Sequence, residues 1–134
     1  MKRHSILLAL ALAASAPAAV LACGACVEDN VAATYDHAVI EAAIARHHQV
    51  VFVAIEGSLD AARIGARVKA AAAALRGVQA GTVRTSLSPP AFSFALDRAQ
   101  SADAAVAAFR TAVGDPAARL TVVRIMRDGV LEPK

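Results

Sequence analysis

The chain has 134 residues, which suits one domain and an N-terminal segment. Hydrophobic residues make up 57% of it but aromatic residues only 4%, so we expect a core built mainly of alanine and valine. The net charge is +3, and Lys2 and Arg3 at the N-terminus supply two of these charges. No run of lysine and arginine is dense enough for nucleic-acid binding, which excludes that class of function.

Residues 1–22 have the pattern of a bacterial secretory signal peptide. A positively charged start is followed by an apolar run over 6–14, and Val20 and Ala22 occupy the −3 and −1 places of a small-residue cleavage site. The apolar run is short for a membrane span of about 20 residues. We therefore expect an exported, periplasmic protein with no membrane span in its mature form. The four residues ending at Cys23 also form an imperfect lipobox, so a lipid anchor on Cys23 is an alternative.

The two cysteines of the chain, Cys23 and Cys26, form a Cys-x-x-Cys directly after the predicted signal. Two thiolates at this spacing can hold one soft ion such as copper(I), or they can close a disulfide. In exported proteins such cysteine pairs are commonly oxidised to a disulfide. Two cysteines alone cannot complete a tetrahedral zinc site. Soft-metal binding, a redox-active or inert disulfide, and lipidation of Cys23 all remain open on this pattern.

Apolar periodicity and turn residues predict the remaining elements in chain order. They are a helix over 30–47, a strand over 50–55, a helix over 59–76 capped by Ser58, strands over 82–87 and 92–96, a helix over 101–113 and a strand over 120–126. The strand over 50–55 is apolar on both faces, which predicts a central strand covered on both sides.

After the first helix, this order reads βαββαβ and predicts a ferredoxin-like α+β domain over 49–134. Its antiparallel sheet would have four strands in the order 4-1-3-2, with the helices over 59–76 and 101–113 on one face. The segment 23–48 would hold the cysteines and the extra helix. We expect that helix to cover the opposite face through Val31, Tyr35, Val39 and Ala42.

Histidines are the other candidate ligands. His37 and Glu41 are spaced i,i+4 in the predicted helix, where they either hold a metal or form a solvated pair. A straight helix from Cys26 to His37 is about 16 Å long, so His37 can join the cysteines only if their segment folds back. His47 and His48 mark the end of the predicted helix, where the free carbonyl groups stabilise a protonated imidazole. Thr85, Ser86 and Ser88 have no histidine or carboxylate at a spacing typical of a nucleophile, and we expect no enzymatic activity.

Short motifs between residues 51 and 97 occur in the order of a known family. They are Glu56-Gly57-Ser58, then Ile64, Val68 and Leu75-Arg76-Gly77-Val78, then Val83 and Leu87, then Ala91-Phe92-Ser93-Phe94 and Asp97. This stretch resembles a heavy-metal-associated domain of the copper-chaperone type, and the resemblance implies the ferredoxin-like fold and a soft metal. That family binds its metal through a Cys-x-x-Cys in the loop after the first strand. The corresponding Gly57-Ser58-Leu59-Asp60 has no cysteine, so the family's ligands cannot be carried over to this loop.

The sequence thus predicts a small exported heavy-metal-binding protein. Cys23 and Cys26, with His37 as a third candidate ligand, would hold copper(I) or another soft heavy metal and pass it to a protein partner by ligand exchange. The alternatives are a periplasmic thiol–disulfide exchange protein and a lipoprotein or interaction module.

Overall fold

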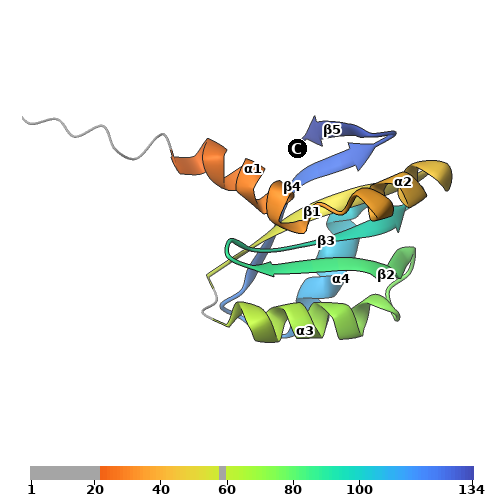
Figure 1. The fold of residues 1–134 in the computed structure, drawn as a ribbon. Coiled ribbons are helices and arrows are strands. Elements are labelled where there is room, and N and C mark those ends of the chain that lie inside the picture. The colour runs from red at the N-terminus through yellow and green to blue at the C-terminus, as the bar shows by residue number, and fades with distance from the viewer. Residues whose placement is uncertain (1–21, 58–59) are drawn as a thin grey trace, which may run out of the picture.

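The computed structural model describes the backbone of residues 22–57 and 60–134, and the side chains in these ranges from Val27 onward. Residues 1–21, with most of the predicted signal peptide, lie outside the described residues. The described residues form an α+β domain with four helices and a five-stranded antiparallel sheet (Figure 1). In chain order the elements are α1 (Ala22–Thr34), α2 (His37–Ala45), β1 (His48–Glu56), α3 (Ala61–Ala72), β2 (Val78–Leu87), β3 (Pro90–Asp97), α4 (Ala102–Val113), β4 (Arg119–Arg127) and β5 (Val130–Pro133).

The sheet has the strand order β2-β3-β1-β4-β5. The predicted sheet of four strands is wrong, because the chain turns back at Asp128 and Gly129, both with positive φ, and β5 pairs with the end of β4. This fifth strand has four residues and is largely exposed, so it lacks the apolar alternation by which a strand is recognised in a sequence. β1 lies inside the sheet between β3 and β4, as its two apolar faces predicted.

Helices α3 and α4 cover one face of the sheet (Figure 1). The side chains of Val51 and Val53 point from β1 into this layer. The ring of Phe109 on α4 packs against two phenylalanines of β3, with centroids 5.3 Å from Phe92 and 4.9 Å from Phe94. Three of the four phenylalanines of the chain are therefore gathered in this layer, where each ring buries a large apolar area.

The N-terminal segment covers the opposite face, as predicted. Here Val50 and Phe52 of β1, together with residues of β3 and β4, pack against Val31 of α1 and against α2 through Val39, Ile40 and Ala43. β1 is thus buried on both sides, and the molecule has three layers, with the sheet in the middle.

The prediction of one helix over 30–47 is wrong, because the chain breaks at Tyr35 and Asp36. Asp36 has an extended backbone, and its carboxylate accepts hydrogen bonds from the N–H groups of Ala38 at 2.9 Å and Val39 at 3.2 Å. This is the geometry of an N-cap, so Asp36 starts a second helix instead of continuing the first. Tyr35 consequently lies 48% exposed rather than in the buried stripe, and Ala42 is only half-buried.

The start of helix α3 and the start of strand β2 also differ from the prediction. Helix α3 is capped by Asp60, whose carboxylate accepts a hydrogen bond from the N–H of Arg63 at 3.0 Å, rather than by Ser58, which lies outside the described residues. It ends at Ala72, and a turn through Gly77 with φ +78° leads directly into β2. β2 therefore starts at Val78, ahead of the predicted residue 82.

Candidate functional site

The Cys-x-x-Cys lies within helix α1, at the start of the described part of the chain. This helix covers Ala22–Thr34, so Cys23 and Cys26 are inside it and not ahead of a helix that starts at Asn30. Positions three apart share one side of a helix. The side chains of both cysteines lie outside the described part of the chain.

The other end of α1 is fixed to the middle of the sheet. The hydroxyl of Ser93 on β3 donates a hydrogen bond to the carbonyl of Thr34 at 2.8 Å, and both residues are buried. The Thr34 hydroxyl donates in turn to the carbonyl of Asn30 at 3.1 Å. The Ser93 hydroxyl thus satisfies one of the carbonyls left free at the end of a helix. It also sets the direction in which α1 leads back to the cysteines.

His37 lies on a different helix from the cysteines. It is the first residue of α2, and its Nε2 is 3.1 Å from a carboxylate oxygen of Glu41, with the two side chains 72% and 68% exposed. The structure therefore confirms the i,i+4 pair, and His37 as a metal ligand stays a prediction. Among the side chains from Val27 onward that are described, no three histidine, cysteine, aspartate or glutamate residues are grouped so as to hold a metal.

Asp36 joins the start of α2 to β2. Its carboxylate is 2.7 Å from Nε of Arg84, and this hydrogen bond is the main cause that lowers the pKa of Asp36 below its ordinary value. Two backbone N–H groups of α2 lower this pKa further. Arg84 is 48 positions away along the chain, so the sequence carries no local signal for this pair.

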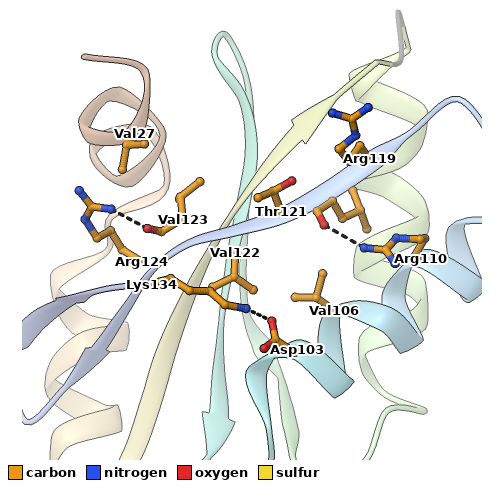
Figure 2. Close-up of a pocket in the computed structure, with 11 residues that line it drawn as sticks. Val27, Asp103, Val106, Arg110, Arg119, Thr121, Val122, Val123, Arg124 and Lys134 are labelled. Atoms are coloured by element: carbon orange, nitrogen blue, oxygen red, sulfur yellow. Dashed lines mark hydrogen bonds and ion pairs between the residues drawn. The ribbon is translucent and has the colours of Figure 1, made fainter. Parts of the chain in front are cut away.

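A groove of about 730 Å³ begins one residue after the Cys-x-x-Cys (Figure 2). Val27 of α1 lines one end, and β4 runs along the groove toward Arg119 and the Arg110 side chain of α4. Near Val27, α1 also contacts β4 through an ion pair of 3.5 Å between Glu28 and Arg124. Sequence reasoning missed the groove because it brings α1 beside α4 and β4, which come much later in the chain.

Comparisons with protein-family models, curated proteins and solved structures gave no match. The loop after β1, where the copper-chaperone family holds its metal, begins at Gly57 with φ +77° and contains no cysteine. In the described portion of the chain, no helix is both long and apolar enough to cross a membrane.

Proposed function

We propose that this chain is an exported protein that binds a soft heavy metal, such as copper(I), through Cys23 and Cys26. The observation that carries the proposal is that both cysteines lie within helix α1, directly after the expected cleavage site, so that in the mature protein they would form the first turn of this helix. Backbone N–H groups and the helix dipole at an N-terminus favour thiolates, and the thiolate is the form that binds metals. Thiolate ligands select soft ions such as copper(I).

Transfer to a partner needs no chemistry beyond ligand exchange. A two-coordinate ion leaves room for a thiolate of the partner to bind as a third ligand, after which one of the two cysteines dissociates. His37 is retained as a candidate third ligand, although its imidazole already has Glu41 as a neighbour. A histidine ligand would have to leave Glu41 and approach α1.

The remainder of the chain serves as the scaffold in this proposal. We propose a ferredoxin-like domain over 49–134, extended by β5, which resembles the heavy-metal-associated domain in its motifs but has moved the cysteines to the segment 23–48. Residues 1–22 would direct export to the periplasm. Cleavage after Ala22 would make Cys23 the first residue of the mature protein and leave the first turn of α1 at its N-terminus.

A thiol–disulfide exchange protein is the second candidate, and the same position of the cysteines in α1, at the start of the expected mature chain, favours it. A thiolate at a helix N-terminus attacks disulfides readily, and a second cysteine three residues away can resolve the mixed disulfide. A lipid on Cys23 would exclude both functions, because it removes one of the two thiols.

The decisive experiment combines an intact mass with a metal titration. The mass of the purified mature protein separates free thiols, a disulfide and a diacylglyceryl group on Cys23. The reduced protein is then titrated with copper(I) against a chromophoric chelator, and we expect about one ion per chain. The variant with Cys23→Ser and Cys26→Ser should bind none and fold normally, whereas His37→Gln should keep the stoichiometry. Equal binding by the double-serine variant would refute the site.

A further inference from the structure

One edge of β4 is free in its first half. β1 pairs with β4 along one side from Arg119 to Arg127, but on the other side β5 pairs only with Arg124–Arg127. Over 119–123 no strand among the described residues lies on that side. A strand edge without a partner strand presents N–H and C=O groups that can bind another extended chain. Here the carbonyls of Leu120 and Val123 accept hydrogen bonds from the side chains of Arg110 and Arg124, at 3.1 Å and 2.8 Å, so an added strand would have to share or replace these bonds.

The groove follows this free edge and combines apolar and basic side chains. Figure 2 shows Val106 and Val122 in the hollow, with arginines toward both of its ends. This mixture suits an extended segment that alternates in character, because successive side chains of a strand point to opposite sides.

The groove carries more positive charge than its own carboxylates neutralise. Arg110 donates a hydrogen bond to the carbonyl of Leu120 at 3.1 Å, and no carboxylate of the described residues lies within ion-pair distance of it. Arg119 is 77% exposed, and its contact with Glu56 is long, at 3.9 Å. Lys134 differs, because it is paired with Asp103 (Figure 2). Arg110 and Arg119 are thus the cations that remain available to a ligand.

We propose that this groove binds an extended acidic segment of a partner protein, which adds to the sheet as a strand along residues 119–123 of β4. Main-chain hydrogen bonds to a sheet edge supply affinity in this mode of recognition, and side-chain pockets supply specificity. On the α4 side, apolar residues of the segment would face Val106 and Val122 and a carboxylate would pair with Arg110; on its other side a carboxylate would pair with Arg119.

The charges around the groove disfavour two other ligands, a second copy of the chain and a nucleic acid. Two copies of the chain joined by their β4 edges would bring the arginines of both copies together, and like charges across paired strands are destabilising. A nucleic acid is disfavoured because the basic residues are few and Asp103 lies among them.

The position of the groove connects it with the proposed metal site. Val27 lines the groove and directly follows Cys26, so a segment bound along β4 would hold its protein beside the Cys-x-x-Cys. This role in metal transfer rests on the proposed function, whereas the binding of the segment does not require the cysteines.

The test uses a fluorescent synthetic peptide of valine, threonine and glutamate, with glutamates on both sides of the extended chain. We expect it to bind the purified chain, with amide chemical-shift changes at 119–123, and to bind the double-serine variant of Cys23 and Cys26 equally well. Failure of metal binding and failure of docking are therefore measured separately. A peptide with lysines in place of glutamates, and one with alternate backbone amides methylated, should both lose binding.

Variants of the two available arginines test the groove itself. Arg110→Gln and Arg119→Gln should each weaken peptide binding about two- to fivefold, the range for exposed charge pairs. Arg119 is the safer site because its side chain is 77% exposed, whereas Arg110 also holds the carbonyl of Leu120. Arg76→Gln, an exposed arginine in the turn after α3 and outside this groove, should change nothing and is the matched control.

Four outcomes would overturn the proposal. They are no binding of the acidic peptide, equal binding of the lysine or methylated peptides, preferential binding of an oligonucleotide, and, in the free chain, protection from hydrogen exchange of those 119–123 amides that point away from β1. The last would show that a second copy or another part of the chain already occupies the edge.

Discussion

At the scale of single residues, Asp36 decides where the N-terminal layer bends. Its carboxylate caps α2, so a new helix starts here instead of a continuation of α1. The same carboxylate pairs with Arg84 of β2 and so attaches α2 to the sheet. A helical pattern of apolar residues runs straight through this position, which is why periodicity alone predicted one helix.

Replacing Asp36 with asparagine should lower stability in a pH-dependent way. Asparagine keeps the capping oxygen but loses the charge that Arg84 pairs with. Because the folded-state pKa of Asp36 lies below the ordinary 3.8, the contribution of its charge is fully present above that pH and is lost as the pH falls through the folded-state pKa. The unfolding temperature of Asp36→Asn should therefore be lower than that of the wild type at neutral pH, and the difference should shrink in strong acid. Asp29→Asn on α1 controls for the loss of a surface carboxylate.

Two glycines make a matched pair for a test of backbone strain. A Cβ on Gly57 would lie 2.4 Å from the carbonyl oxygen of Ala117, and its φ of +77° is unfavourable for other residues. Gly57→Ala should cost about 1–3 kcal/mol of unfolding free energy. Gly81→Ala, where a Cβ meets nothing within 4 Å, should be near neutral. Denaturant unfolding of both variants gives the comparison, and similar costs would contradict the role of the Gly57 turn.

At the scale of elements, the sequence predicted what periodicity encodes. The apolar run of β1, the alternation in β3 and the helical pattern of α4 all depend on neighbours in the chain, and each element was found close to its predicted position. The start of α3 at Ala61 was missed because Asp60 and Ser58 are both good caps, and only the geometry selects Asp60. The short, exposed β5 was missed because its own residues have no strand pattern. It forms a strand because it pairs with the end of β4.

The hydrogen bond between Ser93 and Thr34 should hold the cysteine helix in place. Ser93→Ala leaves the buried carbonyl of Thr34 without this donor, and the expected cost is about 1–3 kcal/mol. Amide hydrogen exchange should rise more in α1 than in α4, because α4 packs on the other face of the sheet. Ser86→Ala on β2 is the control. Uniform loss of protection in α1 and α4 would mean that the bond stabilises the whole domain rather than the position of α1.

At the scale of the whole molecule, the candidate site divides into a predictable and an unpredictable part. The Cys-x-x-Cys is visible in the sequence because its chemistry depends on two residues three apart. The groove beside it depends on Val27, Val122 and Arg110, which come together only when α1, β4 and α4 are assembled around the sheet. No local pattern carries that information.

The shared central strand should make the three layers unfold together. β1 sends Val51 into the layer with α3 and α4, and sends Val50 and Phe52 into the layer with α1 and α2, so neither layer can be lost without exposing one side of this strand. Tyr35, between α1 and α2, is the only tyrosine of the chain, and there is no tryptophan. Its fluorescence therefore reports on the N-terminal layer, while circular dichroism reports on the whole molecule.

We expect the two signals to change at the same denaturant concentration, as in two-state unfolding. Phe52→Ala removes a fully buried ring from the N-terminal layer and should cost about 3–5 kcal/mol. Phe109→Ala should cost a similar amount from the opposite layer, and each variant should shift both signals equally. If Phe52→Ala instead moves the tyrosine transition to lower denaturant and leaves most of the circular dichroism in place, the N-terminal helices detach by themselves. The cysteines would then sit on a layer that can separate from the sheet, and the groove, which needs Val27 of α1 beside β4, would be lost with it.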